Sequence, residues 1–145
     1  VDELDDRHRG IVAMAEAGSE LGQWARGLVI DGHNDFYLPS QDELEVIYRN
    51  LKPTTRENSQ YGRSGINLSA APPTTAYTRE HPAQTAAEAF VTGGEQAFAG
   101  EWYWSSTQHA GDTDCAWGQL FYVGYQGGSS KSASLRARAV RRFAI

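Results

Sequence analysis

Apolar residues recur at helical spacing near the start of the chain. Ile11 and Trp24 belong to this pattern, and Gly18-Ser19 interrupts it. We therefore predict helical structure over residues 5–28. Residues 1–18 are predicted to serve as a linker or an oligomerisation helix.

A second helix is indicated by its start signal. Ser40 is followed three residues later by Glu43, the spacing of a capping box, in which each side chain bonds the backbone N–H of the other residue. Leu44 then begins a stripe of apolar residues at helical spacing. The helix is predicted to run from Ser40 to Asn50 or Leu51.

The middle of the chain lacks regular patterning. Residues 52–78 contain prolines, glycines and many small polar side chains, so we predict one long loop, with apolar anchors that include Tyr61 and Tyr77. A short helix is predicted over residues 85–91, followed by a turn at Gly93-Gly94.

The last third of the chain predicts strands. Aromatic and β-branched residues favour strands over residues 102–106, 119–125 and 135–143. The stretches between them, rich in Gly, Ser and Asp, are typical of exposed loops. Residues 102–143 are therefore interpreted as a region that displays side chains from a rigid support.

Side chains alternate between the two sides of a strand, which divides the middle strand into two sets. The first set is Trp117, Gln119 and Phe121, and the second is Gly118, Leu120 and Tyr122. We predict that the first set builds a rigid frame and that the second is displayed. A bulge or turn is expected at Gly124, where the parity changes.

Size and charge limit the function classes. The 145 residues fit one domain, predicted over residues 1–145, and the net charge of -5 argues against a nucleic-acid binder. The arginines near the end of the chain are expected to form ion pairs within the fold: Arg136, Arg138, Arg141 and Arg142. A single cysteine, Cys115, rules out an internal disulfide framework.

No constellation of residues predicts catalysis. The four histidines lack metal-ligand spacing, and no nucleophile elbow or phosphate-binding loop occurs, so we expect neither an enzyme nor a cofactor. The oxygen-rich residues 31–35 lack the distal Glu of a calcium loop and predict a structural turn instead. Trp102, Trp104 and Trp117 are expected in the core rather than as sugar-stacking platforms.

Two blocks of sequence carry a family resemblance. Residues 35–44 contain Asp-Phe-Tyr-Leu-Pro-Ser followed by Glu-Leu, and residues 102–141 contain Trp-Tyr-Trp-Ser-Ser, Ala-Trp, Phe121, Gly124, Lys131 and Arg-Ala-Val-Arg. Together they resemble the Legionella collagen-like protein C-terminal domain family. That family occurs in bacterial surface proteins, phage tail proteins and targets of diversity-generating retroelements.

The resemblance implies an α+β fold of the C-type-lectin-like class. Its parts are two helices packed on a small twisted antiparallel sheet, long irregular loops, and a carboxy-terminal strand near the centre of the sheet. The resemblance also suggests the hypothesis that the codons of the displayed positions are diversified at adenines. The alternative interpretation is an ordinary set of loops made of small residues, and both interpretations stay open.

We expect a receptor-binding domain of a phage tail fibre or tail tip, located in the virion. Its ligand would be a bacterial surface protein or glycan, without nucleic acid or membrane insertion. Homo-oligomerisation, most simply as a trimer, would raise avidity. A bacterial cell-surface adhesin and a structural tail or baseplate component are the alternatives. The predicted ligand-binding residues, termed the display face, are His109, Asp112, Asp114, Gly118, Leu120, Tyr122, Tyr125, Ser129, Ser130 and Ser132.

Overall fold

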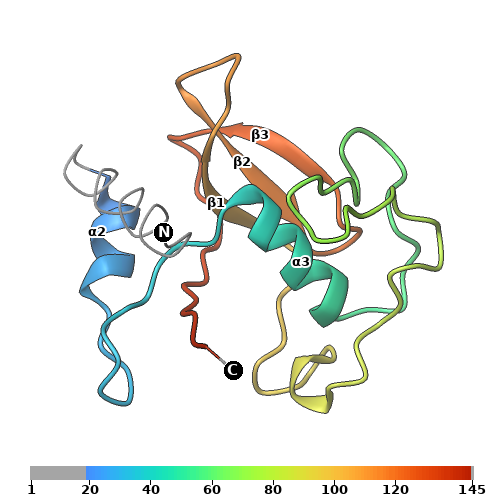
Figure 1. Cartoon of the computed structure of the whole chain (residues 1–145), viewed down its shortest axis with the longest axis horizontal. Coiled ribbons are helices and arrows are strands. Elements are labelled where there is room, and N and C mark those ends of the chain that lie inside the picture. Colours follow the sequence, from blue (N-terminus) through green and yellow to red (C-terminus); the bar gives the residue numbers. More distant parts are fainter. Residues whose placement is uncertain (1–18, 145) are drawn as a thin grey trace. The chain divides into compact units, whose positions relative to one another are not determined.

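A computed structural model of the chain describes residues 19–144, which divide into two compact units. The larger unit is Ser40–Arg136, and the smaller contains residues 19–39 and 137–144. The elements are helices α2 (Glu20–Gly27) and α3 (Gln41–Leu51), the 3-10 helix η1 (Glu88–Phe90), and strands β1 (Trp102–Gln108), β2 (Cys115–Leu120) and β3 (Gln126–Ser130) (Figure 1). The architecture is α+β, as predicted. The linker or oligomerisation helix predicted over residues 1–18 lies outside the described residues, and the single domain stays a prediction.

The predicted capping box of α3 is confirmed. The Ser40 hydroxyl accepts a 3.2 Å hydrogen bond from the Glu43 backbone N–H, and the Glu43 carboxylate accepts one of 3.2 Å from the Ser40 backbone N–H. Both bonds satisfy donors that a helix start leaves unpaired. The helix ends at Leu51, within the predicted boundary.

The sheet has three antiparallel strands in the order β1-β2-β3. The strand predicted over residues 102–106 is confirmed as β1. The strand predicted over residues 119–125 is wrong in its bounds, because β2 ends at Leu120 and a turn follows at residues 121–123. Residues 127–130, expected in a loop, belong to β3. This strand pairs through its backbone with β2, so its Gly and Ser residues do not prevent it from forming.

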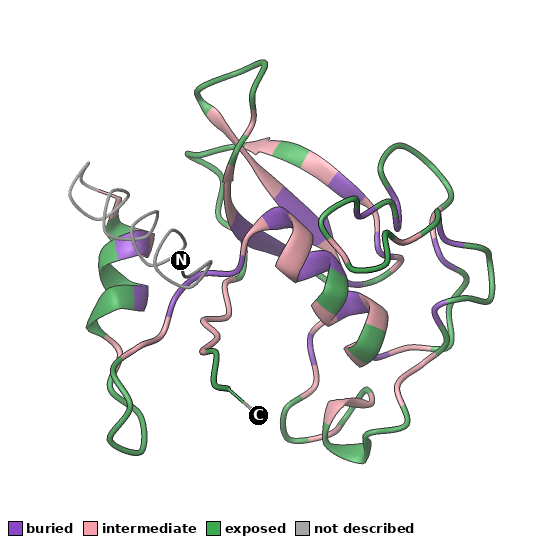
Figure 2. Cartoon of the chain, viewed as in Figure 1, coloured by how far each residue is buried: buried purple, intermediate pink, exposed green. Residues whose placement is uncertain are grey.

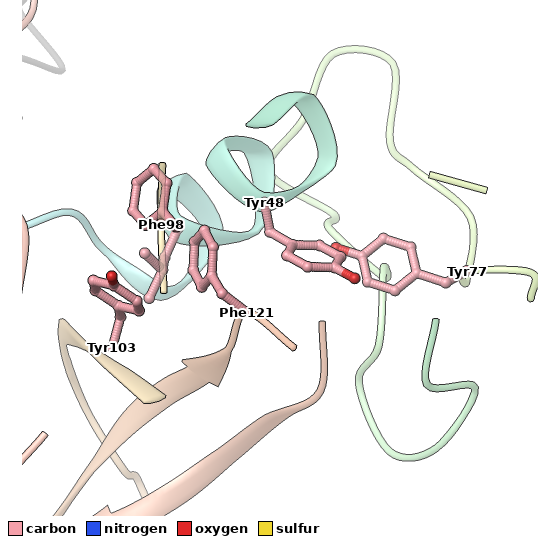
Figure 3. Close-up of a cluster of buried hydrophobic side chains, with 6 residues drawn as sticks. Tyr48, Tyr77, Phe98, Tyr103 and Phe121 are labelled. Atoms are coloured by element: carbon pink, nitrogen blue, oxygen red, sulfur yellow. The ribbon is translucent and has the colours of Figure 1, made fainter. Parts of the chain in front are cut away.

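The core of the larger unit lies between α3 and the sheet (Figure 3). Phe121 is fully buried, and its ring centroid lies 4.3 Å from that of Phe98, 4.9 Å from that of Tyr103 and 5.5 Å from that of Tyr48. Tyr77 extends this row of rings by packing 5.6 Å from Tyr48. Aromatic burial of this kind is the main apolar contribution to the stability of the unit.

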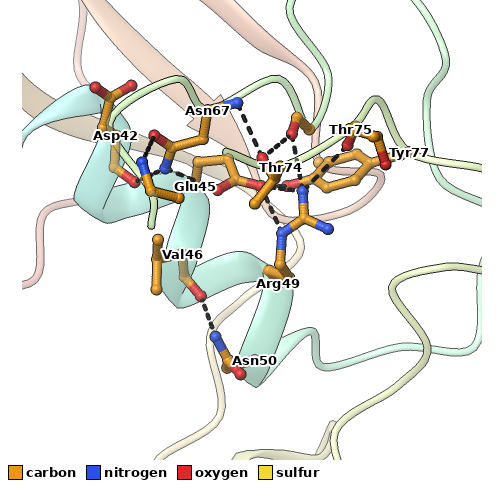
Figure 4. A network of polar contacts seen from close by, with 12 residues as sticks. Asp42, Glu45, Val46, Arg49, Asn50, Asn67, Thr74, Thr75 and Tyr77 are labelled. Atoms are coloured by element: carbon orange, nitrogen blue, oxygen red, sulfur yellow. Dashed lines mark hydrogen bonds and ion pairs between the residues drawn. The ribbon is translucent and has the colours of Figure 1, made fainter. Parts of the chain in front are cut away.

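The long loop over residues 52–78 contains no helix or strand, as predicted, but polar contacts hold it against α3 (Figure 4). The buried carboxylate of Glu45 accepts hydrogen bonds from Arg49 at 2.7 Å, Tyr77 at 3.0 Å and Asn67 at 3.1 Å. At the start of the loop, the buried ammonium of Lys52 donates to the carbonyls of Arg56 and Pro82. Burial lowers the pKa of Lys52. The loop is therefore a packed part of the unit.

Gly124 makes the turn after β2 in a conformation that suits glycine. Its φ is +79°, and an added Cβ would lie 2.3 Å from the Tyr48 ring. The predicted turn at this glycine is confirmed, and the close approach of the turn to α3 explains why no larger residue fits.

The smaller unit is held by its own contacts. Ser19 caps α2 by accepting a 3.1 Å hydrogen bond from Gly22 N. Tyr37 and Val140 exchange backbone hydrogen bonds of 2.8 Å in each direction. The turn at Asp31-Gly32 is confirmed by φ angles of +52° and +77°.

The carboxy-terminal segment does not form the predicted strand over residues 135–143. Within the described chain, that segment makes only isolated bridges, at Arg136 with Tyr103 and at Val140 with Tyr37. The strand that the resemblance placed near the centre of the sheet is likewise absent from the sheet order, in which β2 is central. Bridges at two separated residues satisfy the backbone locally without continuing a ladder.

Candidate ligand-binding face

A buried polar cluster supports the display face from below. Gln119 and Phe121 are completely buried, whereas Trp117, the third predicted frame residue, is half-buried. The Gln119 amide donates a 3.1 Å hydrogen bond to the carbonyl of Gly124, and the Gln126 amide donates one of 3.1 Å to Gln119. These bonds fix the turn between β2 and β3 against the end of β2.

Tyr122 projects from this turn with 36% of its surface exposed. The guanidinium of Arg56 lies over its ring, 4.3 Å from the centroid. The Tyr122 ring also lies close to Gly100, since a Cβ added at Gly100 would be 3.1 Å from Cδ2 of Tyr122. Tyr122 is therefore both accessible and held in one orientation.

Tyr125 is half-buried and lies on the side of the sheet that carries Trp102. The two rings meet edge to face, with centroids 5.9 Å apart and planes at 85°. Two glycines, Gly62 and Gly127, make room for the tyrosine, since an added Cβ would lie 3.3 Å and 3.0 Å from its ring.

His109 begins the loop between β1 and β2, whose residues 110–114 are exposed (Figure 2). Its imidazole stacks on Trp117 with centroids 4.8 Å apart, and its Nδ1 accepts a 3.2 Å hydrogen bond from Gly111 N. Gly128 lies beside the ring, because an added Cβ would be 2.9 Å from Cδ2. The loop therefore starts from a fixed aromatic pair.

Asp112 and Asp114 are exposed on the same loop. The Asp112 carboxylate accepts a 3.0 Å hydrogen bond from the Asp114 backbone N–H, which lowers the pKa of Asp112. Lys131 braces the loop by donating to the carbonyl of Thr113 at 2.7 Å and to the side chain of Gln108 at 3.0 Å. The loop thus presents carboxylates at defined positions.

The serines of the display face lie on and after β3. Ser129 is half-buried, while Ser130 and Ser132 are exposed and lie 2.8 Å apart through their hydroxyl oxygens. All three offer hydrogen-bonding groups, and the two exposed ones are accessible to a ligand.

Five members of the display face are less accessible than predicted, because Gly118 is buried and His109, Leu120, Tyr125 and Ser129 are half-buried. Gly118 is buried, because Trp102, Leu135 and the carbonyl of Tyr103 cover it, the last 3.0 Å from an added Cβ. Leu120, which is half-buried, pairs with Trp102 across the strands. The prediction that the whole second set is displayed is wrong for Gly118, since that side of β2 is covered by other parts of the larger unit.

Residues 56–63 of the long loop lie next to the display face and were not predicted to be part of it. Arg56 contacts Tyr122, Gly62 lies beside Tyr125, and Arg63 lies over the Trp117 ring at 5.9 Å. No local pattern could reveal these contacts, because they join segments far apart in sequence. The prediction of Tyr61 as an apolar anchor of the loop is wrong, because its side chain is 78% exposed, whereas Tyr77 is buried as predicted.

Among residues 19–144, no three His, Cys, Asp or Glu side chains gather closely enough to hold a metal ion. No described helix combines the length and the apolar character needed to cross a bilayer.

Comparison with known protein families identifies the family of this chain. It matches the Lcl C-terminal domain over residues 8–141, and it belongs to this family. The resemblance carried by the two sequence blocks is thereby confirmed. Comparisons with curated proteins and with solved structures gave no significant match.

Proposed function

We propose that this chain is an adhesion domain that binds a receptor on a bacterial surface through the display face. The observation that carries the proposal is the contrast between adjacent residues: Phe121 is completely buried in the core, and Tyr122 is exposed beside it. An accessible aromatic residue on a rigid support provides a large contact area with little loss of conformational entropy on binding.

The residue types of the display face fit this role. Tyr122 and Tyr125 lie in the turn after β2, and exposed aspartates and serines lie before β2 and at the end of β3, at the opposite end of these strands. Such a mixture suits a recognition surface, since the tyrosine anchors the partner while the small polar residues adapt to it. We also propose that the fold is C-type-lectin-like and that the domain binds its partner without catalysing a reaction.

In its finer form, the proposal places the domain at a phage tail fibre or tail tip. The contact would be with a host surface protein or glycan, and display in several copies on a homo-oligomer would raise the avidity of a modest single site. The second candidate is a cell-surface adhesin of a bacterium. Membership of the Lcl C-terminal domain family favours a surface setting and is consistent with either candidate.

The test is binding of the fluorescently labelled chain to a panel of intact bacterial cells, measured by flow cytometry. We expect saturable binding to a subset of the panel, reduced at least about fivefold by Tyr122→Ala. Phe143→Ala is the matched control, because Phe143 is 70% exposed but belongs to the smaller unit. Absence of saturable binding to any cells, or an equal loss in both variants, would reject the proposal.

A further inference from the structure

Residues 56–63 run alongside the turn that carries Tyr122 and Tyr125. Ser59 N donates a 2.8 Å hydrogen bond to the carbonyl of Val123, between the contacts of Arg56 with Tyr122 and of Gly62 with Tyr125. The contacts occur in the same order along both segments. The two segments therefore lie side by side.

Buried residues hold this segment in place. Asn58 is 4% exposed; its side-chain oxygen accepts a 2.7 Å hydrogen bond from Tyr48, and its amide donates one of 2.8 Å to the carbonyl of Pro82. Just after the segment, buried Ser64 donates a 2.7 Å hydrogen bond to the carbonyl of Tyr61. A segment fixed in this way loses little further entropy when a partner binds.

Two guanidinium groups of the segment rest on aromatic rings. Arg56 lies 4.3 Å from the Tyr122 centroid and Arg63 lies 5.9 Å from that of Trp117. Both residues are exposed, and within residues 19–144 neither forms an ion pair, unlike Arg49. A guanidinium over a ring keeps in-plane N–H donors that match a carboxylate, which makes both arginines suited to an acidic partner.

The aromatic arrangement favours a protein partner over a glycan. His109 stacks on Trp117 and the Arg63 guanidinium lies over the same ring, so Trp117 does not offer an open platform for a sugar. Tyr61, between the two arginines in sequence, is 78% exposed. Tyrosine, tryptophan and arginine are the residue types enriched where proteins bind one another.

We propose that residues 56–63 form one recognition surface with Tyr122, Tyr125 and Trp117, and that its partner is a protein segment carrying carboxylates beside aromatic side chains. The inference rests on the proposed function and specifies the chemistry of its receptor. Arg56 and Arg63 act as carboxylate-binding residues, and Tyr61 supplies an aromatic contact.

The experiment is a fluorescence anisotropy titration of the whole chain against labelled poly(Glu,Tyr), with poly(Lys,Tyr) as the matched probe of opposite charge. We expect saturable binding of the acidic copolymer alone, weakened by added salt. Arg56→Gln and Arg63→Gln should each weaken it about threefold, and the double variant about tenfold. Arg79→Gln is the control, because Arg79 is exposed and rests on no ring among the described residues; its binding should stay within about twofold of the wild type.

Three results would overturn the inference: equal binding of both copolymers, an equal loss in Arg79→Gln, or arginine-dependent binding of dextran sulfate without binding of poly(Glu,Tyr). The last result would assign the surface to an anionic polysaccharide. Thermal unfolding of each variant checks that the fold is retained. Cell binding separates this inference from the proposed function: if Tyr122→Ala loses cells while the double arginine variant keeps them, only the inference fails.

Discussion

The phenol of Tyr77 donates a 3.0 Å hydrogen bond to the carboxylate of Glu45, and both side chains are buried. This contact joins the last part of the long loop to α3. Burial and the neighbouring Glu45 charge raise the pKa of Tyr77, so the phenol keeps its proton and remains a donor. The same carboxylate also accepts from Arg49 and Asn67.

Glu45→Ala is therefore expected to lower the free energy of unfolding by about 3 kcal/mol. The substitution removes the acceptor from the buried Tyr77 phenol and one acceptor each from Arg49 and Asn67, which keep their bonds to backbone carbonyls. Urea unfolding measures the change. Glu57→Ala serves as the control, since that carboxylate is exposed and should change stability by no more than about 0.5 kcal/mol. Similar losses in both variants would contradict the role assigned to Glu45.

Gly124 and Gly93 separate two effects of substitution. Both have positive φ angles, +79° and +91°, but only at Gly124 does an added Cβ collide, 2.3 Å from the Tyr48 ring. Gly93→Ala should cost about 1 kcal/mol from backbone strain, and Gly124→Ala about 3 kcal/mol or more because the turn must also move. Thermal or urea unfolding distinguishes these values. Equal costs would show that the contact with Tyr48 is unimportant.

Some of this fold could be predicted from local sequence. The capping box of Ser40 and Glu43 predicts the start of α3 because all its partners lie within one helical turn. Gly124 marks a turn because its backbone conformation is a property of the residue itself. The family could also be identified, from two blocks of characteristic residues.

Other parts depend on contacts that local patterns do not contain. The strand β3 has the sequence Gln-Gly-Gly-Ser-Ser, which has low intrinsic strand preference, and it forms because β2 provides backbone partners. Alternation correctly placed Gln119 and Phe121 in the core, but it could not show that Leu135 and Trp102 cover Gly118. The approach of Arg56 to Tyr122 depends on the path of the whole loop.

Tolerance to large side chains should differ along the display face. Gly118→Tyr is expected to destabilise the protein by about 2 kcal/mol or more, since the carbonyl of Tyr103 lies 3.0 Å from an added Cβ. Ser132→Tyr should change stability by less than about 0.5 kcal/mol, because Ser132 is exposed. Chemical denaturation compares the two variants. If Gly118→Tyr is as stable as the wild type, position 118 is displayed after all.

The ion pair of Asp35 and Arg141 should make stability depend on pH. Arg141 donates hydrogen bonds of 2.8 Å and 3.1 Å to the carboxylate and holds the pKa of Asp35 below its usual value of 3.8. The pair therefore stabilises the folded state above about pH 4, and this contribution is lost as the pH falls through the lower folded-state pKa.

The stability difference between wild type and Asp35→Asn should accordingly be present at about pH 6 and shrink toward about pH 2. Unfolding curves at a series of pH values measure it. A difference that is constant over this range, or that grows as the pH falls, would show that the ion pair does not contribute in this way. Asp31→Asn provides a matched control, because Asp31 is exposed and forms no ion pair among the described residues.

The central claim is that two tyrosines on the rigid turn after β2, exposed Tyr122 and half-buried Tyr125, bind the receptor. Its most direct test is the apparent affinity of the variant Tyr122→Ala,Tyr125→Ala for receptor-bearing cells, relative to wild type and at equal folded fraction. We predict a loss of about tenfold or more, because both aromatic contacts are removed while Phe121 and Gln119 keep the support intact. An unchanged affinity in the folded variant would contradict the claim.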